Sequence, residues 1–390
     1  MTSTASWTRR RPRRRRRSGP ALAHFRPLAA ALLAVVVAAA AHAQPAAAPG
    51  AVAGTVRDAD GRPLAGASVY LSGTTRGDAA DADGRFRIEG VPPGAYRVVA
   101  SMIGFETGAE PVEIGPGARL SVDFGLAEAT AELGDVRVEG ERDRRWERRL
   151  AQFTRALIGE SENAAETRIL NPEVLSFRLR WGRLRATAAA PLVVENRALG
   201  YRLTYDLRAF SASATEVGYD GDERFEELEP ASPDEAARWA EARARAYRGS
   251  LRHLLRALLR NRLAEERFSL TLTDDGPGAG YRWRGPASAR RVMQLQDESG
   301  WGVLQFRGRL EVTYHGEPEE PAYLESDWFY ERRGRPDSVQ RSVVRLDGGG
   351  VRIDPQGTPE DPFAVVTSGY LAFDRLADLV PEEYEPPDEP

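Results

Sequence analysis

The chain has 390 residues, which is enough for two or three domains. It carries 54 basic and 58 acidic side chains, for a net charge of −4, and every basic side chain is an arginine. The absence of lysine excludes Schiff-base chemistry and a P-loop. The absence of cysteine excludes disulfides, thiol nucleophiles and a lipid-anchored cysteine.

The first 43 residues have the pattern of a secretory signal peptide, and residues 44–50 read as a linker. Arginine dominates Arg9–Arg17, an apolar run covers Leu28–Ala40, and Ala41-His42-Ala43 is a small-x-small cleavage site before Gln44. Removing the signal takes away nine arginines and no acid, which leaves 45 arginines against 58 acids and a net charge of −13. We therefore expect an exported acidic protein in the periplasm, at the outer-membrane periphery or outside the cell. Its charge argues against a nucleic-acid partner, and no transmembrane span is predicted in the mature chain.

Short alternating apolar runs between Ala51 and Leu126 are typical of β-strands. Val52 and Val56 share one face of a first strand, and Phe86 with Ile88 follows a turn. A last strand is predicted from the alternation of Leu120, Val122, Phe124 and Leu126. Turns that recur about every 8 to 12 residues indicate an antiparallel β-sandwich over residues 51–127.

Four stretches of this region carry turn and strand signals: Ala53–Val56, Pro63–Val69, Asp83–Phe86 and Gly94–Val98. Gly66 suits a positive φ, and Asp83-Gly84 suits a hairpin turn. Through these stretches the region resembles the carboxypeptidase-like regulatory domain, a transthyretin-like (prealbumin-like) sandwich common in envelope proteins of Bacteroidota. The resemblance implies a fold but no chemistry, because in the enzymes that share this domain the zinc peptidase is a separate domain.

Residues 128–160 are predicted to form a connecting strand and an amphipathic helix. The stretch Leu133–Gly140 is similar to a short β-segment that follows this domain in TonB-dependent receptors, although no plug or long barrel follows here. Within Arg142–Gly159, apolar side chains recur at helical spacing at Trp146, Leu150, Phe153 and Leu157.

Residues 161–380 predict an α+β domain that is rich in strands. Alternation predicts strands from Leu175 to Trp181 and from Tyr201 to Leu207. A helix is expected from Ser232 to about Glu266, bent at Gly249, because Ser232, Pro233 and Glu235 form a capping signal. From Phe268 to Val351 the pattern is β again, including one strand from Trp301 to Tyr314, and a short helix or turn is expected between Tyr370 and Leu379. The acidic, proline-rich tail 381–390 is predicted to be disordered.

Residues 141–390 also resemble an uncharacterised C-terminal region found with this sandwich in envelope proteins of Bacteroidota. The stretches that carry this resemblance are Ile169–Pro172, Val194–Tyr201 and Ala246–His253. The resemblance implies no known activity. The predicted fold class is mainly β, with an N-terminal antiparallel sandwich and an α+β second domain that has one long helical segment.

No residue set matches a known catalytic pattern. The mature chain has two histidines, His253 and His315, and neither has a glutamate at zinc-site spacing. Ser250 lacks the Gly-x-Ser-x-Gly elbow of a serine hydrolase. The acidic stretch Asp220–Glu223 offers carboxylates for glycoside hydrolysis or calcium binding, but a solvated turn is the favoured interpretation.

Two polar groups remain as binding candidates, Glu195-Asn196-Arg197 and His253. For the first a buried turn network is favoured over a ligand site, and for His253 a structural role is favoured. The basic helical face of Arg252, Arg256, Arg260 and Arg262 is expected to pair with neighbouring acids. Trp181, Trp301 and Trp328 could stack on sugars but are expected in the core.

The sequence therefore predicts an exported, non-enzymatic binding or structural protein of the cell envelope, with no cofactor. Its partner would be an envelope protein or a glycan, and an association with the outer membrane is possible. Two alternatives stay open. One is an envelope hydrolase whose catalytic part lies in residues 141–380. The other is a small outer-membrane-associated protein related to TonB-dependent receptor systems.

Overall fold

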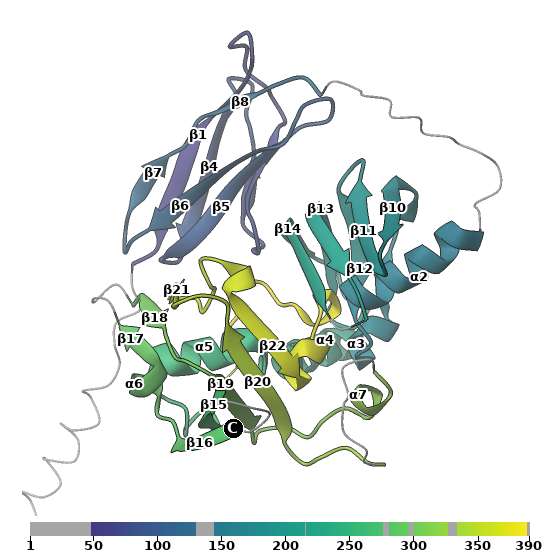
Figure 1. Cartoon of the computed structure of the whole chain (residues 1–390). Coiled ribbons are helices and arrows are strands. Elements are labelled where there is room, and N and C mark those ends of the chain that lie inside the picture. Colours follow the sequence, from purple (N-terminus) through teal and green to yellow (C-terminus); the bar gives the residue numbers. More distant parts are fainter. Residues whose placement is uncertain are drawn as a thin grey trace, which may run out of the picture. The chain divides into compact units, whose positions relative to one another are not determined.

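The computed structural model describes residues 48–129, 144–214, 216–275, 281–295, 300–326 and 334–387 (Figure 1). The signal peptide, the Leu133–Gly140 segment and Trp328 lie outside these residues. Five sheets form within the described residues. None of the helices described there is both long and apolar enough to cross a bilayer.

Residues 50–126 form the predicted β-sandwich from two four-stranded sheets. One sheet joins β1 (Gly50–Asp58) to β4 (Arg85–Val91), β7 (Arg119–Ser121) and β8 (Phe124–Leu126). The other has the order β3 (Gly77–Ala79), β2 (Ser68–Leu71), β5 (Gly94–Ser101) and β6 (Gly108–Ile114). Alternating apolar side chains fill the space between the sheets, including Val52, Val56, Val69, Leu71, Phe86, Ile88 and Val98. The sandwich fold is confirmed.

Three details of the sandwich differ from the prediction. The turn Asp81–Gly84 connects β3 to β4 in the opposite sheet, so it is not a hairpin turn. The predicted last strand is divided into β7 and β8, because Asp123 between them accepts two hydrogen bonds from the backbone and hydroxyl of Thr55, each 2.8 Å long. Both short strands also run parallel to β1, whereas the sequence predicts only antiparallel pairing.

A six-stranded sheet follows, packed against α2 (Arg144–Ile158). Its strands are β9 (Thr167–Ile169), β10 (Leu175–Arg180), β11 (Arg183–Ala188), β12 (Leu192–Asn196), β13 (Tyr201–Ala212) and β14 (Val217–Glu227). The short helix α3 (Glu162–Ala165) connects α2 to β9, and η1 (Pro172–Val174) connects β9 to β10. Phe153 and Leu157 of α2 are fully buried against the sheet, as their helical spacing predicts.

The predicted long helix is in fact two helices, α4 (Pro233–Tyr247) and α5 (Leu251–Leu259). The chain breaks at Gly249, whose φ of +76° belongs to the left-handed region that glycine favours. Ser250 then caps α5 by accepting a hydrogen bond from the His253 amide at 3.2 Å. The helix also ends earlier than predicted, at Leu259 instead of Glu266.

A second hydrophobic cluster surrounds α5, which is buried along most of its length. The cluster also includes side chains of a five-stranded sheet. In spatial order its strands are β16 (Tyr281–Pro286), β15 (Phe268–Asp275), β19 (Arg309–Tyr314), β20 (Gln340–Leu346) and β22 (Val365–Gly369). A small sheet contains β17 (Met293–Leu295), β18 (Gly302–Leu304) and β21 (Val351–Ile353). The short helices of this part are α6 (Ala289–Val292), α7 (Pro321–Glu325), η2 (Pro362–Ala364), α8 (Tyr370–Phe373) and η3 (Leu376–Asp378).

Three further predictions for the residues after the sandwich are wrong. The strand predicted from Trp301 to Tyr314 is two strands, β18 and β19, in different sheets. Trp181 is not in the core: its side chain is 90% exposed at the turn between β10 and β11. The tail is not disordered over residues 381–387, because Arg256 and Gly73 bind its backbone and Glu382 is buried. The short helix predicted after Tyr370 is confirmed as α8 and η3.

Candidate functional site

A cleft of about 900 Å³ lies between the sandwich and the domain that follows it. One wall comes from β5 and β6 of the sandwich, and another from β14. The loop Thr358–Phe363 supplies a third wall. The lining side chains that matter below are Arg97, Glu113, Arg208, Asp222, Phe363 and Glu382.

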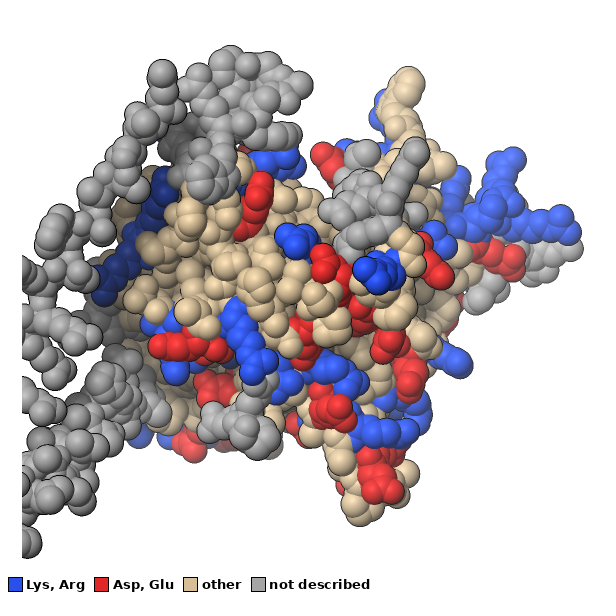
Figure 2. All heavy atoms as spheres, turned by 90° about the horizontal axis from the view of Figure 1, so that it is seen from below, with Lys and Arg blue, Asp and Glu red and all other residues tan. Residues whose placement is uncertain are grey.

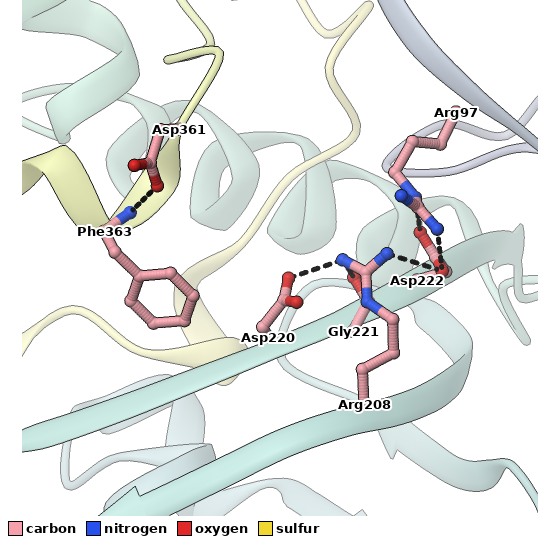
Figure 3. A network of polar contacts seen from close by, with 7 residues as sticks. All are labelled: Arg97, Arg208, Asp220, Gly221, Asp222, Asp361 and Phe363. Atoms are coloured by element: carbon pink, nitrogen blue, oxygen red, sulfur yellow. Dashed lines mark hydrogen bonds and ion pairs between the residues drawn. The ribbon is translucent and has the colours of Figure 1, made fainter. Parts of the chain in front are cut away.

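Asp222 of β14 is the centre of the polar network in this cleft (Figure 3). It is 2% exposed and accepts a hydrogen bond from Nε of Arg97 at 2.9 Å and from Nη1 of Arg208 at 3.1 Å. Arg208 also pairs with Asp220. Because Arg97 belongs to the sandwich and Arg208 to β13, one buried carboxylate ties the two domains together.

The acidic stretch Asp220–Glu223 is therefore not the solvated turn that the sequence favours, since it lies inside β14. Gly221 is required there for packing: a Cβ at this position would lie 2.5 Å from Cζ of Tyr205 on the neighbouring strand. Arginines from two other strands compensate the charge of Asp222, which lets an acidic residue be buried in a sheet.

The 358–363 loop brings an apolar surface to the cleft. Phe363 is 51% exposed, and its ring is 3.6 Å from the position that a Cβ would take on Gly218 of β14. Asp361 holds the loop in place by accepting a hydrogen bond from the Phe363 amide at 2.9 Å. An exposed aromatic ring thus lies beside the Asp220–Arg208 pair (Figure 3).

Further charges of the cleft are also paired across the domain boundary. Arg352 of β21 lies 3.6 Å from a carboxylate oxygen of Glu113 in the sandwich and 3.3 Å from one of Glu360. Its guanidinium also stacks on Trp301, which is buried as the sequence predicts, at 4.1 Å from the ring centre. The pKa of Glu223 is raised to about 7, chiefly by burial and also by the nearby charge of Asp222.

The predicted cluster Glu195-Asn196-Arg197 does not line this cleft. Glu195 pairs with Arg197 at 2.8 Å and Arg202 at 2.9 Å, and the hydrogen bond from Arg202 is the main reason that the pKa of Glu195 is lowered. Asn196 is buried, donates to the Ala377 carbonyl at 2.8 Å and accepts from the Leu199 amide at 3.0 Å. These contacts join β12 to η3 and to the turn before β13.

His253 lies apart from the cleft and uses both ring nitrogens inside the fold. Nδ1 accepts a hydrogen bond from the Gly249 amide at 3.0 Å, so Nε2 carries the proton and donates to Glu266 at 3.1 Å. Burial lowers the pKa of His253. His315 is bound to the Ser269 hydroxyl at 2.8 Å. Within the described ranges no group of three or more His, Cys, Asp or Glu side chains could hold a metal ion.

The predicted basic face of α5 is only partly paired with acids. Arg260 lies 3.6 Å from Glu385, and Arg262 lies 2.7 Å from Glu265. Arg252 and the buried Arg256 bind backbone carbonyls of residues 380–384 instead. On the face that Figure 2 shows, arginines and acids are interspersed, without one large basic area.

The sequence did not predict the cleft, because the strands and the loop that form its walls are far apart in the chain. Arg97 and Asp222 are separated by 125 positions. The density of acids at Asp220–Glu223 was the available signal, but the Asp-Gly pair inside it favoured a turn.

Comparisons with known proteins agree with the fold of the sandwich. The model of the carboxypeptidase regulatory-like domain family matches residues 51–127, and no curated protein matches the chain. Among solved structures, the minor pilin GBS52 of Streptococcus agalactiae shares 19% identity over 22% of this chain and 46% of the pilin, with a TM-score of 0.19. The chain thus spans less than half of that pilin.

Two further solved structures cover about half of this chain. A candidate carbohydrate binding protein from Bacteroides uniformis shares 12% identity over 47% of this chain and 68% of its own, with a TM-score of 0.19. A DUF3823 family protein from Parabacteroides merdae shares 10% identity over 46% and 81%, with a TM-score of 0.18. With scores this low we draw no functional argument from these likenesses. Residues 51–127 are thus similar to the carboxypeptidase regulatory-like domain family.

Proposed function

We propose that this protein is an exported, non-catalytic binding protein of the cell envelope, and that the cleft is its ligand site. The carboxypeptidase regulatory-like domain is a non-catalytic domain. The observation that carries the proposal is that this domain and its neighbour share one cleft, whose walls are fixed by ion pairs across the boundary. Pre-formed concave sites between domains are common places for ligands.

The chemistry of the cleft favours a neutral glycan as the ligand. Ion pairs hold Arg97, Arg208, Asp220 and Asp222 in place, so the cleft offers fixed hydrogen-bond donors and acceptors. Its lining as a whole is acidic, with seven carboxyl groups and two arginines, which disfavours an anionic ligand. The half-exposed ring of Phe363 adds a flat apolar surface beside them. Sugar rings need this combination, because their hydroxyl groups form hydrogen bonds while their C–H faces pack on aromatic rings.

Titration of the mature chain with neutral hexasaccharides of glucose, mannose, xylose and galactose, followed by calorimetry, tests this proposal. We expect at least one of them to bind, and Phe363→Ala to weaken that binding about tenfold, which corresponds to about 1.4 kcal/mol. Since Phe363 is half exposed, its replacement should leave the melting temperature almost unchanged.

Trp181→Ala is the matched control, because Trp181 is 90% exposed and does not line the cleft. The control should bind as tightly as the unmodified protein. Failure of all four hexasaccharides to bind at millimolar concentration would refute the glycan. Loss of binding in Trp181→Ala alone would move the site to the turn between β10 and β11.

One observation keeps a hydrolase as the second candidate. Glu223 lines the cleft beside Asp222, and its pKa is raised to about 7, chiefly by burial, which suits a carboxyl group that donates a proton near neutral pH. Asp222 is held by two arginines, which favours a structural role for it. Release of reducing sugar from the same hexasaccharides, abolished in Glu223→Gln, would establish the hydrolase and overturn the non-catalytic proposal.

Export rests on the signal pattern of residues 1–43. Mass spectrometry of the protein from a cell-envelope fraction should find Gln44 as the first residue. Protein recovered from the cytoplasm with Met1 retained would contradict export, whatever the cleft binds.

A further inference from the structure

Residues Val380–Tyr384, here called the 380–384 strap, hold three parts of the protein together. On one side, Arg252 donates to the carbonyls of Val380 and Pro381, and Arg256 donates to the Glu382 carbonyl at 2.6 Å. Both arginines belong to α5. Most of the polar contacts of the strap's backbone are thus provided by a buried helix.

On its other side the strap binds the sandwich at the loop between β2 and β3. The Glu382 amide donates to the Gly73 carbonyl at 2.8 Å, and the carboxylate of Glu383 accepts from the amide and hydroxyl of Thr75. The same loop joins the edge of β14, because the Gly73 amide donates to the Glu223 carbonyl at 2.7 Å. The strap therefore ties the sandwich to α5, and it borders the cleft through Glu382.

The Glu382 side chain is lodged where these parts meet, and it is 9% exposed. Its Oε1 accepts from the Thr358 hydroxyl at 3.2 Å, whereas its Oε2 is buried and has no hydrogen-bond partner among the described residues. The carboxyl group packs on Gly73, where an added Cβ would lie 2.9 Å from Cδ of Glu382. A charged carboxylate with an unbonded buried oxygen would destabilise this arrangement.

Two acidic groups around Glu382 add to this penalty, and one cation reduces it. Asp354, from the loop after β21, and Glu223, from β14, are both acidic, and Arg252 of α5 is the cation that faces them. Asp354 is fully buried and binds the amides of Thr358 and Ala95. Glu383 extends from the strap toward the sandwich.

We propose that the 380–384 strap is a proton-controlled latch, whose contacts with the loop between β2 and β3 of the sandwich hold while Glu382 is protonated and break when Glu382 ionises. Opening of the latch would widen the cleft beside Glu382. The latch goes beyond the proposed function, because it concerns the domain boundary and would operate whatever ligand the cleft takes.

The direction in which docking of the strap changes with pH follows from the proton that Glu382 holds when the latch is closed. The pKa of Glu382 is raised from an ordinary value of 4.5 to about 8, chiefly by burial and also by the nearby Asp354 and Glu223, while Arg252 opposes the rise. A released strap gives up that proton at lower pH than a docked one. Docking is therefore favoured at low pH and weakens as the pH rises from 4.5 through 8. Glu223 contributes in the same direction up to about pH 7.

Hydrogen exchange of the complete mature chain tests the latch without any ligand. Protection factors for peptides covering residues 71–77 and 380–385 report how often the latch opens, even when the open state is rare. For one linked proton they should fall about tenfold for each pH unit between pH 6 and 8. In Glu382→Gln, which cannot ionise, they should stay constant between pH 7 and 8.

Two variants separate the latch from a general loss of stability. Glu385→Gln changes a more exposed acid three positions further along and should keep the pH dependence of the unmodified protein. Gly73→Ala should push the Glu382 side chain away and lower protection of both peptides at every pH, while protection of β1 stays unchanged. Protection factors that do not vary with pH, or that vary equally in Glu382→Gln, would refute the latch.

Discussion

Asp222 is the buried carboxylate of the cleft that links the sandwich to the domain after it. It is buried in β14 and accepts hydrogen bonds from arginines of two different domains. A buried carboxylate is tolerated only when its charge is compensated, so the two arginines and the aspartate depend on one another. The domain boundary is thus partly specified by one side chain.

Replacing Asp222 by asparagine should destabilise the protein by about 2 kcal/mol, because it removes charge-assisted hydrogen bonds and leaves two arginines without their carboxylate. Both arginines are partly exposed, which keeps the loss below that of a fully buried pair. Urea unfolding measures the change. Asp83→Asn, in an exposed pair with Arg85, should change the free energy of unfolding by less than about 0.5 kcal/mol. Equal effects of the two substitutions would contradict this role of Asp222.

Among single residues, the sequence revealed the acids of the cleft but not the arginines that pair with them. The density of carboxylates at Asp220–Glu223 was visible, yet the arginines that neutralise Asp222 lie 14 and 125 positions away. Nothing local distinguishes a solvated Asp-Gly turn from a strand whose acids are paired through tertiary contacts. The same limit applies to Arg256, which binds carbonyls about 100 or more positions further along.

Among the elements, the break between α4 and α5 shows how one glycine reorients a chain. Gly249 has a left-handed φ of +76°, and a Cβ there would lie 2.3 Å from Oε1 of Gln340 and 2.8 Å from Cδ1 of Tyr314. Its amide also binds Nδ1 of His253. The sequence indicated a bend at this glycine, but the packing of Tyr314 against it could not be predicted.

Gly249→Ala should therefore destabilise the protein by about 2–4 kcal/mol, from backbone strain and from steric overlap together. Two controls separate these causes in thermal or urea unfolding. Gly61→Ala has the strain of a positive φ in open space and should cost about 1 kcal/mol. Gly115→Ala has neither a positive φ nor a close neighbour, so it should hardly change the free energy of unfolding. A loss for Gly249→Ala no larger than that for Gly61→Ala would show that steric overlap contributes nothing.

The sandwich is the element group that sequence reasoning described best. Alternation placed Val52, Val56, Phe86 and Ile88 in its core correctly, because each strand has one buried face. The connections between sheets were not predictable in the same way. A turn signal such as Asp83-Gly84 says that the chain reverses, but not whether the next strand joins the same sheet or the opposite one.

Because its hydrophobic core is its own, a fragment of residues 48–129 should fold without the rest of the chain. Circular dichroism should show a β-type spectrum and a cooperative melt. The melting temperature should be lower than in the complete protein, since the fragment lacks the contacts of Arg97 and Thr75. Val69→Asp in the same fragment should abolish the melt, because it buries an unpaired charge. A fragment with the spectrum of an unfolded chain would contradict an independent sandwich.

For the whole molecule, the prediction of a mainly β fold with an α+β second part was right. The region after the sandwich is less uniform than expected, since it has one hydrophobic cluster around the six-stranded sheet and another around α5. Acidic composition predicted a disordered tail, but Arg252 and Arg256 bind residues 380–384. Composition cannot reveal these contacts. A segment with high net charge and few apolar residues is expected to be disordered, unless tertiary contacts such as those from α5 hold it.

The resemblance of the sandwich to a carboxypeptidase accessory domain raises the question of zinc chemistry, and we predict that the mature protein has none. A catalytic zinc needs three protein ligands and an open position for water. The mature chain has two histidines and no cysteine. His253 binds Gly249 and Glu266, and His315 binds Ser269, so each is engaged elsewhere. Carboxylates alone would select harder ions such as calcium over zinc.

Metal analysis of the dialysed mature protein should therefore find no stoichiometric zinc, and peptides incubated with it should keep their C-terminal residues. The two histidines allow a direct control. His253→Ala should reduce stability, because it removes a ring packed against Phe268 and Tyr314, but it should leave the metal content unchanged. One tightly bound zinc per chain, together with chelator-sensitive peptidase activity that His253→Ala or His315→Ala abolishes, would overturn this prediction. Such a result would require the histidines to leave their present hydrogen bonds, which crystallography of the zinc-loaded protein would reveal.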